Sequence, residues 1–125
     1  VVVIGCGNSG LQEAEILLQY AKNVSFVEYL DYSIAEKVLQ DRVKSHAKTT
    51  CYLSHMATEV KGENLVKSIV VKNRETGEDV ELPTAAVFIY VGYKPYTDFV
   101  KGLVDLDDYG YIITDKHMRT SVPGM

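Results

Sequence analysis

The 125-residue sequence has no tryptophan, no long apolar run and no excess of basic residues, and these shortages narrow its possible functions. No apolar stretch approaches the roughly 20 residues of a membrane-spanning helix, so we expect no membrane contact. A charged leader followed by an apolar segment is also missing, which favours a cytoplasmic location. The formal net charge of −4 argues against a nucleic-acid partner.

Cysteine is scarce as well, because Cys6 and Cys51 are the only two and they form no C-x-x-C pair. Cys6 is either a small core filler or a reactive thiol whose pKa is lowered by a nearby helix N-terminus. Cys51 is expected to face a core. His46, Cys51 and His55 lack a recognised ligand spacing and fall on a predicted helix end, strand and loop, so we predict no metal site.

Length and composition predict a single domain over residues 1–125. A chain of 125 residues is long enough for one hydrophobic core and too short for a comfortable two. Hydrophobic residues make up 46% and charged residues 24%, which is ordinary for a globular protein and argues against a disordered chain. No internal repeat or low-complexity segment interrupts it.

A glycine-rich turn between a predicted strand and a predicted helix is the most informative feature. The apolar run 1–4 leads directly into Gly5-Cys6-Gly7-Asn8-Ser9-Gly10, which matches G-x-G-x-x-G. We expect Gly5 to make the tight turn, Gly7 to leave room for a pyrophosphate, and Gly10 to let the helix pack closely on the strand. The turn therefore predicts a dinucleotide-binding site.

The surroundings of this turn fit that prediction. Asn8 and Ser9 are short polar residues suited to capping the helix or to contacting phosphate. The free N–H groups and the dipole at the helix start attract the phosphates. Glu28 follows the next β-branched run, where its carboxylate is expected to meet a ribose. With a strand before the turn, a helix after it and an acid at the right distance, the context indicates NAD(H).

Apolar periodicity predicts the remaining elements and an α/β fold. Leu11, Ala14, Leu18 and Ala21 recur at helical spacing, so residues 1–27 form a β-α-β unit. We then expect a helix over 34–43 and a parallel strand over 49–53. The later strands are predicted at 58–61, 66–73 and 79–82, at 85–91 as a buried central strand, and at 111–114. The fold class is thus Rossmann-like with three layers, a central parallel sheet, and an antiparallel β-meander in place of one crossover helix.

In this order, the elements and motifs resemble the pyridine-nucleotide-binding domain of thioredoxin reductase-like flavoenzymes, the class II pyridine nucleotide-disulfide oxidoreductases. The resemblance is carried by residues 5–10, 35–40, 88–95 and 110–124. It implies binding of NADH or NADPH and presentation of the nicotinamide for hydride transfer to FAD, from which a disulfide takes the electrons.

The resemblance also implies partners outside these residues. They are the FAD-binding domain of the same parent chain and a thioredoxin-like or other disulfide protein, and we expect the parent to be a homodimer. The redox-active C-x-x-C and a flavin-contacting segment would flank the 125 residues. We therefore expect an excised domain that binds no FAD and is not catalytically complete by itself.

One departure from the family pattern concerns the choice of nucleotide. NADPH-dependent members usually carry His-Arg-Arg after the second strand and another Arg soon after, and these clamp the 2′-phosphate. Glu28-Tyr29-Leu30 and Ile34 stand in those positions, where nothing basic remains. The pattern is closer to the NADH-using flavoprotein component of alkyl hydroperoxide reductase. We therefore predict that NADH is preferred over NADPH, with Glu28 and Tyr29 as contacts.

Three further residues are candidate cofactor contacts. Gln12 stands where the family often has Glu near the nicotinamide amide, and it is either such a contact or a solvated helix residue. By the resemblance, Val91 and Gly92 approach the pyrophosphate or the nicotinamide ribose. Gly92 is also expected to need an unusual backbone conformation at a strand end.

Some features of the sequence are shared with proteins of other functions. Tyr90-x-x-x-Lys94 has the spacing of short-chain dehydrogenases, but Gly92 and Pro95 break the helical turn which that pair requires, so we reject this assignment. A methyltransferase usually has an acidic residue leading into its glycine loop, where this chain has valine and isoleucine. Binding of S-adenosylmethionine or of NADH would decide between these two enzyme classes. The non-enzyme alternative is an NADH-binding module or redox sensor without disulfide reductase activity.

Overall fold

The computed structural model describes residues 1–125 and divides into two compact units, 1–91 and 92–125. The first unit is built on a four-stranded parallel sheet in the order β3-β2-β1-β7. Val3 of β1 pairs with Phe26 of β2 and with Phe88 of β7. The strands of this sheet are β1 (Val2–Ile4), β2 (Val24–Val27), β3 (Thr49–Tyr52) and β7 (Val87–Ile89).

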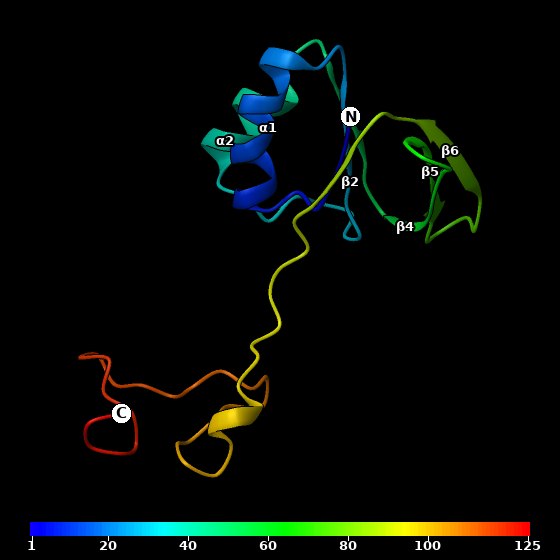
Figure 1. Ribbon diagram of the computed structural model, residues 1–125. Coiled ribbons are helices and arrows are strands. Elements are labelled where there is room, and N and C mark those ends of the chain that lie inside the picture. Colours follow the sequence, from blue (N-terminus) through cyan, green and yellow to red (C-terminus); the bar gives the residue numbers. More distant parts are fainter. The chain divides into compact units, whose positions relative to one another are not determined.

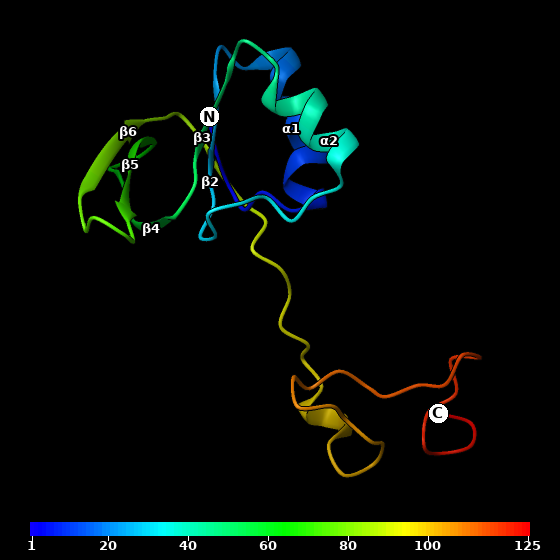
Figure 2. The ribbon, with the colours of Figure 1, turned by 180° about the vertical axis from the view of Figure 1, so that it is seen from behind.

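Two different layers cover the faces of this sheet (Figure 1). Helices α1 (Asn8–Tyr20) and α2 (Lys37–Lys44) lie on one face. A three-stranded antiparallel sheet lies on the other face, and the view from behind in Figure 2 shows the same layering. Its strands are β4 (His55–Gly62), β5 (Val66–Asn73) and β6 (Asp79–Pro83). The predicted three-layer fold with an antiparallel meander is confirmed.

Alternation along the strands creates one core on each face. Val3 and Phe26 point to the helices and join Leu11, Leu39 and other helix residues in the first cluster. Their neighbours Val2 and Val27 point the other way and pack against Ile69, Val71 and Leu82 of the meander. Burial on both faces explains why β1 is a continuous β-branched run.

Several boundaries differ from the prediction. Helix α2 begins at Lys37 rather than at residue 34, because the segment before it is held against the glycine turn as described below. Strand β4 begins at His55, three residues before the predicted start. β7 is an edge strand, not a central one, and it is shorter than 85–91. Its last residue, Ile89, is 64% exposed, so an apolar run alone did not distinguish a central strand from an edge strand.

The second unit contains little regular structure. It has a short 3-10 helix, η1 (Asp98–Val100), and an isolated antiparallel bridge between Leu106 and Ile112. The predicted strand 111–114 is wrong, because all four of its residues are exposed and bury too little apolar surface to support a strand. None of the helices in residues 1–125 has the length and apolarity needed to cross a membrane.

Candidate nucleotide-binding site

The glycine turn leaves β1 through a conformation that favours glycine. Gly5 has φ +102°, and a Cβ atom there would lie 2.2 Å from the carbonyl oxygen of Tyr90. Its N–H donates to the carbonyl of Val27 at 2.8 Å, which ties the turn to the end of β2. The turn thus starts at the carboxyl ends of the parallel strands, where open α/β sheets bind their ligands.

The other two glycines of the motif differ in the space around them. A Cβ at Gly10 would lie 2.2 Å from the carbonyl oxygen of Gly5, so only glycine allows α1 to approach the turn this closely. A Cβ at Gly7 would meet nothing nearer than the Ile34 side chain, at 3.8 Å. A Cβ at Gly7 would therefore make only ordinary van der Waals contact, whereas Gly10 is enclosed by backbone.

The N-terminus of α1 lacks its own cap. Gly7 occupies the cap position without a side-chain hydrogen bond, and the first turn carries no acidic residue. Asn8 does not cap the helix as one prediction had it, because it is already the first helical residue. Its Oδ1 instead accepts a hydrogen bond from the N–H of Glu36 at 2.8 Å, and Ser9 is exposed. The helix N–H groups beside Gly7 are left available to an anion.

Glu28 lies against the glycine turn. Although its side chain is charged, the residue is only 8% exposed. Oε2 accepts a hydrogen bond from the N–H of Cys6 at 2.6 Å, and Oε1 accepts one from the N–H of Leu30 at 3.1 Å. A carboxylate has about four acceptor positions, so these two bonds leave capacity for further donors. Glu28 therefore braces the turn while keeping acceptors that a ribose could use.

Ser33 holds the turn from the other side, a contact that sequence reasoning missed. Its Oγ donates to the carbonyl of Cys6 at 2.5 Å and accepts from the N–H of Ala35 at 3.4 Å. Both backbone groups of Cys6 are thus bonded to side chains, the other being Glu28. Serine in a loop carries no signal that would have revealed this contact from the sequence.

Cys6 is inert rather than reactive. Burial raises the pKa of its thiol from the ordinary 9.0 to about 12, with Cys51 and Glu28 adding to the rise and Lys44 opposing it. The interpretation in which the helix N-terminus lowers this pKa is wrong, because desolvation of the thiolate dominates. Cys6 is a core filler, and half-buried Cys51 packs against the same cluster.

Tyr29 follows Glu28 and contacts a distant residue. Its ring is half exposed, and the guanidinium carbon of Arg74 lies 3.5 Å from the ring centroid. Arg74 also donates from Nη1 to the carbonyl oxygen of Tyr29 at 2.8 Å. Residues 28–30 and Ile34 contain nothing basic, but Arg74 brings a guanidinium to this segment from a distant part of the sequence. Arg74 lies 45 residues away, so no local pattern could place it here.

The remaining predicted residues lie in different places. Gln12 is exposed on α1. The backbone N of Val91 would lie 3.5 Å from a Cβ at Gly5, so its peptide borders the turn, while its side chain is 70% exposed. Gly92 has φ +95°, as expected for a backbone position that favours glycine, and it begins the second unit. His46, Cys51 and His55 form no metal-ligating cluster.

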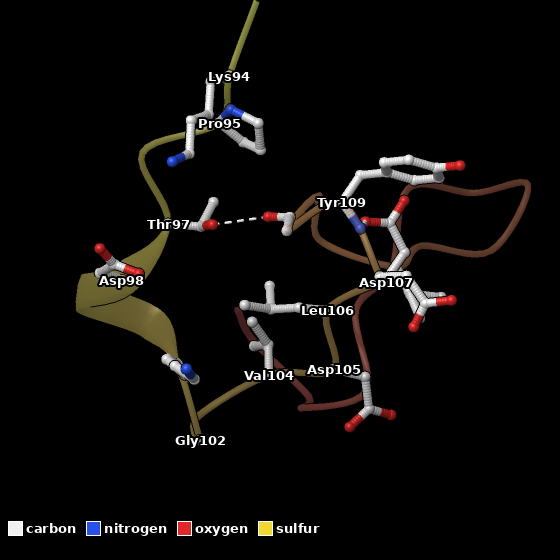
Figure 3. Close-up of a pocket in the computed structure, with 14 residues that line it drawn as sticks. Lys94, Pro95, Thr97, Asp98, Gly102, Val104, Asp105, Leu106, Asp107 and Tyr109 are labelled. Atoms are coloured by element: carbon white, nitrogen blue, oxygen red, sulfur yellow. Dashed lines mark hydrogen bonds between the residues drawn. The ribbon is translucent and has the colours of Figure 1, made fainter.

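A separate cavity of about 750 Å³ lies within the second unit (Figure 3). Asp98, Asp105 and Asp107 contribute to its lining, and Thr97 Oγ1 donates to the carbonyl of Gly110 at 2.6 Å. Asp107 Oδ1 already accepts the N–H groups of two tyrosines of its own loop, Tyr109 and Tyr111. None of the predicted site residues lines this cavity.

Comparison with known proteins gives a consistent result. The family described as "Pyridine nucleotide-disulphide oxidoreductase" matches residues 1–125. A "34.2 kDa protein in rubredoxin operon" of Clostridium pasteurianum is 36% identical over 125 residues, which are 100% of this chain and 41% of that protein. The thioredoxin reductase of Peptoclostridium acidaminophilum is 37% identical over 131 residues, and the match covers 100% of this chain and 42% of that protein.

The solved structures point the same way. The crystal structure of Lactococcus lactis thioredoxin reductase in its FR conformation superposes with a TM-score of 0.90 and 37% sequence identity. The match covers 98% of this chain and 41% of that one. The present chain therefore spans less than half the length of these relatives.

Proposed function

Because the chain belongs to the pyridine nucleotide-disulphide oxidoreductase family, we propose that it is the NADH-binding domain of a thioredoxin reductase-like flavoprotein. The domain presents the nicotinamide to FAD held by another domain of the parent chain, and a disulfide of the parent and then of a protein substrate receives the electrons. One observation carries the proposal: Gly7, which has room for a Cβ, the start of α1 without a side-chain cap, and the Glu28 carboxylate meet at a single turn.

The pyrophosphate fits at Gly7. A Cβ at this residue would contact only the Ile34 side chain, at 3.8 Å, and the adjoining helix start offers N–H donors with no competing carboxylate in the first turn. Both features favour a bound anion, because the N–H groups supply hydrogen bonds and the helix dipole supplies positive potential. The N–H of Cys6 donates to Glu28, and the carbonyl of Cys6 accepts from Ser33. These two hydrogen bonds hold the turn in place before binding, so little conformational freedom is lost when the nucleotide binds.

The adenosine ribose fits beside Glu28. The carboxylate keeps acceptor positions that suit the free 2′- and 3′-hydroxyls of NADH. A 2′-phosphate would add negative charge next to this buried carboxylate, which opposes NADPH. When bound, NADH supplies the hydride, while the residues of this chain bind and orient it.

Nuclear magnetic resonance of the isotopically labelled chain tests this assignment. NADH should shift the backbone amide signals of residues 5–12 and of Glu28, because these groups surround the proposed pyrophosphate and ribose positions. S-adenosylmethionine serves as the control ligand for the methyltransferase alternative and should leave the signals in place. Shifts confined to residues 92–125, or equal shifts with both ligands, would contradict the proposal.

A further inference from the structure

Arg74 reaches the proposed site from a part of the chain that the glycine motif does not include. It follows directly after β5, in the turn that leads to β6 (Figure 1). Its guanidinium stacks on the ring of Tyr29 and donates to the carbonyl of the same residue at 2.8 Å. Arg74 therefore fixes both the ring and the peptide of the residue that follows Glu28.

The backbone around Arg74 is itself anchored. Its N–H donates to the carbonyl of Ser54 at 2.8 Å, and the N–H of Ser54 donates to the carbonyl of Leu30 at 2.9 Å. Ser54 is buried, and its Oγ donates to Glu75 Oε1 at 2.6 Å. These bonds tie the β5–β6 turn to residues 29–30, so the guanidinium is held over the ring by more than its own side chain.

Arg74 forms no salt bridge. The four salt bridges among residues 1–125 involve other side chains, and no carboxylate lies within 4.0 Å of the guanidinium. Stabilising a surface ion pair is therefore not the reason for this contact. What the guanidinium does contact is Tyr29, an aromatic residue at the ribose end of the proposed site.

We propose that Arg74 is a positioning residue for the adenosine half of the nucleotide. It holds the ring of Tyr29, a half-exposed residue, beside Glu28, so that the ring offers a fixed aromatic surface on which the adenosine packs. A tyrosine ordered in advance loses less conformational freedom on binding than a free one, which raises affinity. The inference rests on the proposed function, and it adds a contribution from the meander to a site otherwise built by the β-α-β unit.

The test measures binding of NADH and of ADP-ribose, which carries the adenosine half without nicotinamide, by calorimetry. Arg74→Ala should weaken both ligands at least fivefold. Arg74→Lys keeps the positive charge but loses the planar group that stacks on Tyr29. Its loss of affinity should therefore be more than half as large, in free energy, as that of Arg74→Ala. The matched control is Lys67→Ala, which removes an exposed charge from β5, the strand that Arg74 follows, and should leave both affinities within twofold.

A double-mutant cycle separates positioning from general damage to the fold. If Arg74 acts through Tyr29, Arg74→Ala should change affinity less than twofold once Tyr29→Ala is present, and melting temperatures should show that all variants are folded. The inference would be overturned if Arg74→Ala lowered the affinity as much in the Tyr29→Ala background as in the unmodified chain. Unchanged ADP-ribose affinity in Arg74→Ala would also overturn it, and either result would leave the proposed function in place. Absence of NADH and ADP-ribose binding in the unmodified chain would overturn both.

Discussion

Replacing Gly7 by valine separates a working nucleotide site from a turn that merely has its shape. Gly7 has φ −78° and ψ 179°, an extended conformation that valine adopts readily. Its new Cβ would meet only Ile34, at 3.8 Å, which is ordinary van der Waals contact. We therefore expect Gly7→Val to cost less than about 1 kcal/mol of stability and to shift the melting temperature by only a few degrees.

Binding should respond differently, because the valine methyl groups occupy the space next to the free N–H groups of α1. A displaced pyrophosphate loses those donors, so we expect NADH affinity to fall at least tenfold, about 1.4 kcal/mol. Calorimetry gives the affinity and circular dichroism the melting temperature. A folded Gly7→Val protein with unchanged NADH affinity would refute the reasoning and exclude this turn as the binding site.

Gly10→Val is the matched control within the same motif. Its Cβ would lie 2.2 Å from the carbonyl oxygen of Gly5, so α1 must move away from the turn. Overpacking of this kind costs about 1–3 kcal/mol, and both stability and NADH binding should fall. If Gly7→Val and Gly10→Val lowered the melting temperature equally, the conclusion that only Gly7 has room for a side chain would be wrong.

Three further outcomes follow from the structure. Because the pKa of Cys6 is raised from 9.0 to about 12 in the folded chain, the unfolded chain loses this proton first. The free energy of unfolding should therefore fall as pH rises above about 9 in urea titrations, and Cys6→Ala should show a shallower fall. Iodoacetamide at pH 8 should label Cys6 far more slowly in the folded chain than in urea. The purified chain should be colourless and should not reduce an aromatic disulfide with NADH, and a flavin absorption band would contradict this.

Local sequence patterns were sufficient to predict most elements of the fold. The glycine turn, α1 and β5 could be predicted because each depends on neighbouring residues: an apolar run, a helical repeat, and a β-branched segment bounded by turn residues. The edge position of β7 could not, because a run of apolar residues does not say how many strands lie beside it. The start of α2 was misplaced for a similar reason, since bonds to Cys6 and Asn8 hold residues 33–36 out of the helix.

The candidate site also contains residues that local sequence identifies and residues that it does not. Gly5, Gly7, Gly10 and Glu28 could be identified because their spacing follows from the β-α-β unit. The contact between Arg74 and Tyr29 could not, since it joins residues 45 apart through the packing of two sheets. The raised pKa of Cys6 could not be predicted from the sequence either, because it comes from burial beneath elements that are distant in sequence.

Titration of the chain with NADH and NADPH tests the central claim most directly. Isothermal calorimetry should show NADH binding about ten- to a hundredfold more tightly, about 1–3 kcal/mol, because a 2′-phosphate meets the Glu28 carboxylate. Glu28→Gln removes the charge but keeps an oxygen for the N–H of Cys6, so it should narrow the difference. Equal affinities, tighter NADPH binding, or no binding of either nucleotide would contradict the account.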